Sequence, residues 1–273
     1  MRTSIFAMKP RCIFCYHKSG TILLKNVFEE LCNIYDWAFL VRMGRQQEIP
    51  SGVDFTLFGH SPVEIQLQTH DFHGVHVIRD PRDIIVSGYL YHLRTTEAWC
   101  IQNNFDLTPP IDYPNVPFSQ RHRSEEWKKE YIHSLGGLSY QEKLKSLSTE
   151  DGIAFEMLHY GRWTIESMMK WDYSASNMLE VRFEEIMGEY DFTFRRMFRF
   201  LRLTEEQENV GMKIAQRHDI SRKTEKEIYH LDHVFSRKTS RWRHHFSPAH
   251  KELFIELFGN CLVKLGYENT NGW

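Results

Sequence analysis

The sequence lacks the features that mark several protein classes. Its five cysteines, at positions 12, 15, 32, 100 and 261, are odd in number and scattered, unlike those of a disulfide framework. No stretch approaches the roughly 18 consecutive apolar residues of a membrane span, and the start, MRTSIFAMKPRCIFCY, has no apolar core long enough for a signal peptide. We therefore expect reduced thiols in a cytoplasmic protein with no membrane partner.

The chain also lacks an excess of charge of either sign. Its 34 basic and 36 acidic residues give a formal net charge of −2, so no overall basic field favours a nucleic acid as partner. Apolar residues make up 41% of the 273 positions and charged residues 26%, an ordinary globular balance that can bury a substantial core. An anionic ligand would have to bind to local clusters of positive charge.

Short apolar strands alternate with helical patterns along the chain. Strands are predicted over 11–16, 54–59, 74–79 and 178–183. Helices are predicted from Thr21 to about Ile34, and over 81–93, 121–135, 139–147, 151–171, from 184 to Leu203, 204–217 and 248–266. Strands separated by helical crossovers imply one α/β domain over 1–273, with a central, mostly parallel sheet flanked by helices. Ligands of such sheets bind beyond the carboxyl ends of the strands.

The stretch CYHKSGT, residues 15–21, lies between the first strand and the first helix. Backbone N–H groups at a helix start favour an anion, Gly20 permits close approach, and Lys18 adds a full positive charge. The order G-x-x-x-x-G-K-[ST] of the triphosphate loop is not met, because Lys18 precedes the glycine. Taken alone, the stretch is equally compatible with a capped helix start and a solvated lysine.

A second stretch, IRDPRDIIVSGY, follows the third strand. Arg79 leaves that strand, and Ser87 lies eight residues later on a helix for which Asp80 is a suitable N-cap. An arginine fork suits a terminal phosphate, and a nearby hydroxyl can share it. The alternative is a surface ion pair between Arg79 and Asp83.

The two stretches together resemble the family of sulfotransferases that use 3′-phosphoadenosine 5′-phosphosulfate (PAPS). Three further segments, DFTLFGHSP, LEVRFEEI and FSRKTSRWRHHFS, resemble family segments in the same order, so that the resemblance covers about residues 11 to 265. It implies a P-loop NTPase-like α/β fold and transfer of a sulfuryl group from PAPS to a small-molecule acceptor. The product of the donor would be 3′-phosphoadenosine 5′-phosphate (PAP), and no metal would be required.

The resemblance assigns roles to individual residues. The family's phosphosulfate loop corresponds to Lys18, Ser19, Gly20 and Thr21. Its 3′-phosphate pair corresponds to Arg79 and Ser87, and its carboxyl-terminal phosphate contacts correspond to Arg237 and Lys238. Phe183 takes the position of an adenine-contacting tyrosine, and Ser221, in the basic segment, is a separate candidate for contact with the adenine. Lys18, His60 and Ser87 are the predicted catalytic residues. Lys18 would stabilise the leaving phosphate, and His60 would act as the general base, which is the usual role of a neutral histidine near pH 7.

Some alternatives stay open. His70 is a rival base, because Thr69-His70 also resembles a pair in some relatives, although His60 is preferred as a strand-end residue followed by Pro62. Ile22, Leu23 and Thr239 replace residues that the family usually has. A kinase or a non-catalytic nucleotide-binding protein on a related sheet remains the alternative function. The acceptor could be an alcohol, phenol, sugar or amine, and the sequence allows a homodimer.

Other features of the sequence say less about function. Neither the pair Cys12-x-x-Cys15 nor the triplet His70, His73 and His76 has the arrangement of a metal site, so none is predicted. The long loop at about 95–120 is predicted to face the acceptor, and the basic segment at about 217–247 to bind the nucleotide. Aromatic residues in and after the loop either line an acceptor pocket or anchor the loop itself: Trp99, Phe105, Tyr113, Phe118 and Trp127.

Overall fold

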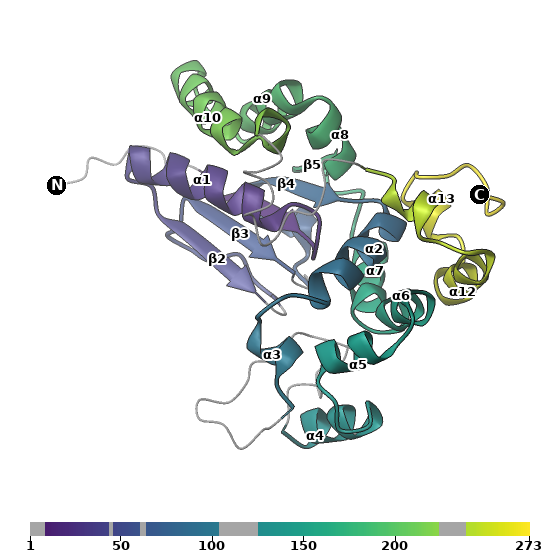
Figure 1. Cartoon of the computed structure of the whole chain (residues 1–273). Helices are drawn as coiled ribbons and strands as arrows, with labels where there is room; N and C mark the ends of the chain where they lie inside the picture. Colours follow the sequence, from purple (N-terminus) through teal and green to yellow (C-terminus); the bar gives the residue numbers. More distant parts are fainter. Residues whose placement is uncertain (1–8, 44–45, 61–63, 104–124, 224–238) are drawn as a thin grey trace. The chain divides into compact units, whose positions relative to one another are not determined.

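The computed structural model describes residues 9–43, 46–60, 64–103, 125–223 and 239–273 (Figure 1). The chain forms two compact units. Unit 1 comprises Met1–Arg79 and Trp171–Glu227, and unit 2 comprises Asp80–Lys170 and Ile228–Trp273. Each unit has a hydrophobic core of its own.

A five-stranded parallel sheet forms the centre of unit 1. Its strands are β1 (Arg11–Cys15), β2 (Phe39–Met43), β3 (Phe55–Gly59), β4 (His73–Ile78) and β5 (Met178–Arg182). In space they follow the order β2-β3-β1-β4-β5. Because all neighbours are parallel, the carboxyl ends of all the strands lie along one edge of the sheet. The prediction of an α/β fold with a parallel sheet and flanking helices is confirmed.

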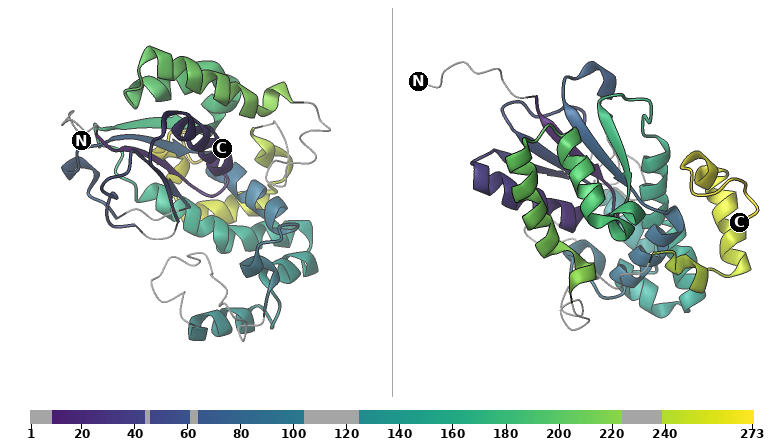
Figure 2. Two further views of the ribbon diagram at one scale, coloured as in Figure 1. Left: turned by 90° about the vertical axis from the view of Figure 1, so that its left-hand side faces the viewer. Right: turned by 90° about the horizontal axis from the view of Figure 1, so that it is seen from above.

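The three central strands of unit 1, β1, β3 and β4, are buried on both faces. Along β1, Ile13 and Cys15 enter one core, whereas Cys12 and Phe14 enter a second core on the opposite face. The helices of unit 1 are α1 (Thr21–Tyr35), α8 (Phe183–Gly188), α9 (Tyr190–Phe200) and α10 (Glu205–His218). Of these, α10 packs against both α1 and α9 on the first face (Figures 1 and 2).

Unit 2 is helical in its described part. Its helices are α2 (Pro81–His92), α3 (Ala98–Ile101), α4 (Glu125–Ser134), α5 (Tyr140–Ser146), α6 (Thr149–Leu158), α7 (Tyr160–Met169), α12 (Pro248–Phe258) and α13 (Cys261–Lys264). As predicted, Asp80 caps α2, because its side chain accepts a hydrogen bond from the Arg82 amide. The core of unit 2 is rich in aromatic residues, and α6 packs against α2, α7 and α12.

Three buried polar side chains join α2, α5 and α6. Glu156 Oε2 accepts hydrogen bonds from Tyr140 Oη and from His92 Nδ1, both at 2.8 Å. All three residues are fully buried. Gly88 lies beside them, and a Cβ there would come within 2.5 Å of Glu156 Oε1, so only glycine fits without a shift. This His92–Glu156–Tyr140 cluster links three helices of unit 2.

The structure differs from the predicted elements in several places. The helix predicted from 184 to Leu203 is two helices, α8 and α9, and α3 lies within the loop predicted at about 95–120. β2 was not predicted, and it is an edge strand of mixed exposure. The helix predicted over 151–171 is two helices, α6 and α7, which meet at His159. The helix predicted over 248–266 is also divided, because Gly259, with φ of 56°, ends α12.

The five cysteines are free and buried. Burial raises the pKa of each thiol above its ordinary value of 9.0, to about 12 for Cys15. The prediction of reduced thiols agrees with these positions. Among the helices of the described residues, none is long and apolar enough to cross a membrane.

Candidate functional site

The loop between β1 and α1 is held by its own hydroxyl groups. Ser19 Oγ accepts a hydrogen bond from the Tyr16 amide at 2.7 Å and donates one to the Tyr16 carbonyl at 2.9 Å. Thr21 Oγ1 donates to the same carbonyl at 3.1 Å, and the Ser19 amide does so at 3.1 Å. Both predicted hydroxyl residues therefore shape the loop around the Tyr16 peptide.

The start of α1 is arranged to receive an anion. Gly20 is the N-cap, with φ of 100°, and it offers no side-chain hydrogen bond to the helix. The first N–H groups of an α-helix have no partner within the helix and carry a partial positive charge. No acidic residue lies in the first turn of α1. The amides of Thr21 and the next two residues are therefore suited to a phosphate or sulfate group.

Arg79, at the end of β4, is tied directly to this loop. Its Nη1 donates a hydrogen bond to the Lys18 carbonyl at 2.8 Å, and its guanidinium lies 4.7 Å from the centre of the Phe183 ring. Phe183 also lies against the loop, since a Cβ at Gly20 would come within 3.2 Å of its ring. The structure thus brings Lys18, Gly20, Arg79 and Phe183 together, as the sequence predicts.

His60 follows β3 and joins the same edge of the sheet. Its amide donates to the Cys15 carbonyl at 3.1 Å, and its ring packs edge-on against the His17 ring with 5.1 Å between centres. Lys18 and His60 have φ values of 61° and 53°, which place two non-glycine residues in the left-handed region. Strained backbone of this kind concentrates at functional sites. His17, which the sequence reasoning missed, connects the two predicted catalytic residues.

The rival histidine lies at the other edge of the sheet. His70 is exposed and precedes β4, and its carbonyl accepts a hydrogen bond from Asn177, the residue before β5. The amino ends of parallel strands lie opposite the carboxyl ends, where the Lys18 loop is found. The geometry therefore favours His60 over His70 as the base.

Two further predicted residues lie on other elements of the described chain. Ser87 is buried on α2 in unit 2. Ser221 is exposed in the turn after α10, where its amide donates to Asp219 at 2.8 Å. Arg237 and Lys238 lie outside the described residues. Their roles stay predictions.

Asp83 lies inside unit 2 and is not a surface residue. Its carboxylate accepts hydrogen bonds from the backbone amides of Ser240 at 2.6 Å and Trp242 at 3.1 Å. The chain just after Thr239 is thereby attached to α2. Because Asp83 is buried, it cannot form the surface ion pair that was the alternative for Arg79 and Asp83.

The structure describes two of the residues that depart from the family pattern, Ile22 and Leu23. Ile22 is exposed, with 43% of its surface accessible. Leu23 is partly buried and packs against the core of unit 1. Phe183, next to Gly20, is the aromatic ring that the structure places against the loop.

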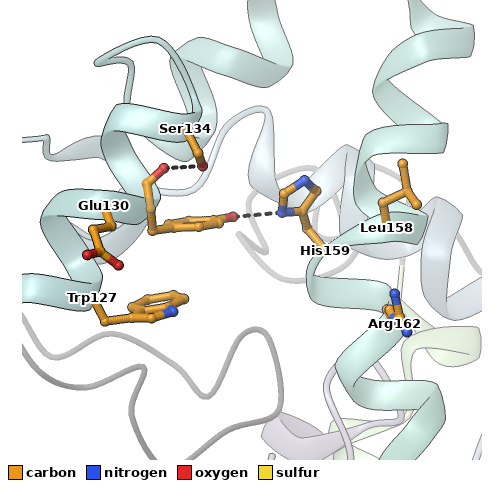
Figure 3. A pocket seen from close by; sticks show the side chains of 7 residues that line it. Trp127, Glu130, Ser134, Leu158, His159 and Arg162 are labelled. Carbon is orange, nitrogen blue, oxygen red and sulfur yellow. Dashed lines mark hydrogen bonds between the residues drawn. The ribbon is translucent and has the colours of Figure 1, made fainter.

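Unit 2 contains a cavity of about 410 Å³, which Figure 3 shows. It is lined by residues of α4, the junction of α6 with α7, and the start of α7: Trp127, Glu130, Tyr131, Ser134, Leu158, His159 and Arg162. The Trp127 and Tyr131 rings stack with 4.9 Å between centres. Of the aromatics predicted for an acceptor pocket, Trp127 lines this cavity, Trp99 is buried in the core, and the others lie outside the described residues.

His159 is the histidine that lines this cavity. Its Nδ1 lies 3.1 Å from Tyr131 Oη, and its ring stacks on Phe155 with 4.0 Å between centres. Burial lowers the pKa of His159 to about 4, so the ring is neutral at pH 7. Nothing in the residues on either side of His159 signalled this environment.

The described ranges contain no group of three or more His, Cys, Asp or Glu residues arranged to hold a metal ion. His76, one of the three spaced histidines, instead pairs with Glu180 across two strands.

Comparison with known proteins gives one family and a set of similar solved structures. Residues 44–266 match the family model described as the sulfotransferase domain, which is well over half of the chain. The fold resembles mouse sulfotransferase SULT7A1 complexed with PAP, with 15% identity over 96% of this chain and 87% of that chain, at a TM-score of 0.41. It also resembles retinol dehydratase in complex with androsterone and inactive cofactor PAP, with 12% identity, coverage of 93% and 80%, and a TM-score of 0.44. No curated protein sequence matches the chain significantly.

The matched range includes His60, Arg79 and Phe183 but begins after the loop at 15–21. The connection of that loop to the matched residues comes from the contacts of Arg79 and Phe183 with it.

Proposed function

Because this chain belongs to the sulfotransferase family, we propose that it transfers the sulfuryl group of PAPS to a hydroxyl or amine of a small-molecule acceptor. One observation supports this most. Lys18, Arg79 and His60 meet around one loop at the carboxyl edge of the sheet. That edge is where α/β proteins bind their ligands.

The nucleotide of this proposal carries two anionic ends, and different residues are proposed for each. The α1 amides and Lys18 suit the phosphosulfate, and Gly20 leaves room for its close approach. Arg79 and Ser87 are proposed for the 3′-phosphate, with Arg237 and Lys238 as further phosphate contacts. Phe183 is proposed to face the adenine, and Ser221 to contact it.

PAPS supplies an activated sulfuryl group whose leaving partner is a phosphate oxygen. In the proposed reaction the bond between sulfur and the acceptor oxygen or nitrogen forms while the bond to that phosphate oxygen breaks. Lys18 and the α1 amides stabilise the negative charge on the departing oxygen. His60 takes the proton of the acceptor as it attacks. The chemistry requires positioning and charge stabilisation more than covalent participation of the protein.

A binding experiment tests the proposal first. PAP without magnesium should raise the melting temperature of the protein, whereas magnesium-ATP should do so less. Stabilisation by magnesium-ATP alone would support a kinase in its place. Transfer of labelled sulfate from PAPS to a panel of phenols, alcohols, sugars and amines then identifies the acceptor class. A protein that binds PAP but transfers to none of these would point to a non-catalytic nucleotide-binding protein. The small-molecule acceptor, the cytoplasmic location and a homodimer stay predictions.

A further inference from the structure

A line of hydrogen bonds runs from Glu180 on β5, whose side chain is partly exposed, through the buried His76 to the loop that follows β1. Glu180 on β5 lies beside His76 on β4 in the strand register, and Glu180 Oε2 is 2.5 Å from His76 Nδ1. The other ring nitrogen of His76, Nε2, is 2.9 Å from Tyr16 Oη. Trp171 stacks on the His76 ring at 3.8 Å and donates from Nε1 to Glu180 Oε1 at 3.1 Å. The line therefore spans β5 and β4 and ends at the first loop residue.

The hydrogen bonds of His76 fix which nitrogen carries its proton. A carboxylate can only accept, so the proton lies on Nδ1, and Nε2 accepts from the Tyr16 hydroxyl. His76 is completely buried, and burial lowers its pKa although Glu180 acts in the opposite direction. A neutral ring with both nitrogens bonded is the arrangement that a buried histidine needs. Each member of the line thus determines the orientation of the next.

Tyr16 connects this line to the loop. Its backbone carbonyl receives hydrogen bonds from Ser19 Oγ, the Ser19 amide and Thr21 Oγ1, and its amide donates to Ser19 Oγ. The side chain of the same residue is only 4% exposed and is held by His76. The position of the Tyr16 peptide therefore sets the shape of the loop that carries Lys18.

We propose that Glu180, His76 and Tyr16 are positioning residues that hold the anion-binding loop in shape from inside the sheet. An apolar side chain at position 76 could fill the centre of the sheet without the cost of burying polar groups. Fully satisfied polar networks give a single arrangement, which an apolar core does not by itself impose. The benefit of the line is accordingly the orientation of the loop, and its value for nucleotide binding rests on the proposed function.

The test compares two tyrosine hydroxyls of unit 1. Tyr16→Phe removes the bond to His76, and the matched control Tyr190→Phe removes a buried bond from Tyr190 Oη to the Ala215 carbonyl at 2.8 Å. Both variants should lose similar thermal stability. Hydrogen exchange of the Ser19 amide, measured without nucleotide, should become faster in Tyr16→Phe only. Affinity for PAP, measured by calorimetry, should fall about tenfold in Tyr16→Phe and stay unchanged in the control.

A third variant tests transmission along the line. Glu180→Leu removes the acceptor that sets the His76 tautomer. Among the described residues the Glu180 carboxylate bonds His76 and Trp171, and the contact that leads from there to the loop is that of His76 with Tyr16. Faster exchange at Ser19 in this variant supports the proposal, whereas changes confined to β4 and β5 contradict it.

The outcomes separate the two proposals. If Ser19 exchanges no faster in Tyr16→Phe than in Tyr190→Phe, the positioning role is wrong. If Ser19 exchange responds as expected but the wild-type protein does not bind PAP, the positioning role is supported and the proposed function is wrong.

Discussion

Each unit of the molecule links a glutamate, a buried histidine and a buried tyrosine, but the three residues are connected differently, and only in unit 2 is the glutamate buried as well. In unit 1 the histidine is central, and the line Glu180–His76–Tyr16 leads from the sheet to a loop. In unit 2 the carboxylate is central, and His92 and Tyr140 both bond to one oxygen of Glu156 among three helices. The same residue types can thus orient a distant loop or fasten helices, depending on which of them lies in the middle.

This difference predicts a division of labour. Substitutions in the sheet edge of unit 1 should change chemistry and nucleotide binding more than stability. Substitutions in the Glu156 cluster should change stability with little effect on nucleotide binding.

The largest effect is expected for Lys18→Ala. Removing the charge beside the departing phosphate should lower turnover about 1,000-fold, the scale of losing one strong stabilising group in a transition state. Lys25→Ala is the control, because Lys25 lies on α1 and pairs with Glu29 at 3.1 Å on the surface. Transfer of labelled sulfate and the melting temperature should be measured together. Equal turnover of the two variants would show that Lys18 and its loop do not take part in sulfuryl transfer.

The next effect concerns the base. His60→Ala should lower turnover about 100-fold, the contribution typical of general base catalysis, and should remove the acidic limb of the pH–rate profile. His70→Ala should leave both nearly unchanged, since His70 lies at the amino edge of the sheet. The opposite result for the two variants would assign the base to His70.

Glu156→Leu tests the buried cluster of unit 2. It leaves His92 Nδ1 and Tyr140 Oη buried without their shared acceptor, and should lower the free energy of unfolding by about 3 kcal/mol. Glu166→Leu breaks an exposed pair with Arg162 and should cost at most about 0.5 kcal/mol. Urea titration gives both values. A folded Glu156→Leu protein with much weaker PAP binding would contradict the division of labour.

The last prediction concerns the pH dependence of unit 2 stability. Folding lowers the pKa of His159 from 6.5 to about 4, so the unfolded chain binds a proton that the folded chain does not. Stability should therefore fall as the pH decreases from about 6.5 toward 4, by at most about 3 kcal/mol. Urea midpoints between pH 7.5 and 4.5 measure this loss, and His159→Gln should reduce it. An unchanged slope in that variant would mean that other groups cause the loss.

Much of the fold could be predicted because its signals are local. Four of the strands are short apolar segments followed by turn residues, and Asp80 with Pro81 marks the start of α2. β2 was missed because it is an edge strand that alternates only weakly. The break at His159 was missed although Gly161 follows two residues later, where a Cβ would come within 2.9 Å of the Glu156 carbonyl oxygen.

The candidate site could be predicted only in part. Lys18, His60 and Arg79 follow strands, and parallel pairing brings such positions together. The line beneath them could not be predicted, because Glu180 lies 104 residues from His76 in the chain. Their contact depends on the order of β4 and β5 and on a register that a single sequence does not reveal.

The buried thiols provide a chemical reporter in each unit. Cys15 donates a hydrogen bond to Thr21 Oγ1 at 3.3 Å, directly beneath the loop, and Cys100 donates to the His92 carbonyl at 3.6 Å, beside the Glu156 cluster. Since the thiolate is the reactive form and burial raises the pKa of both thiols, we expect neither to react readily with an alkylating reagent while its region is closed. The rate at which each native cysteine is alkylated therefore measures how often its own region opens, with no label introduced.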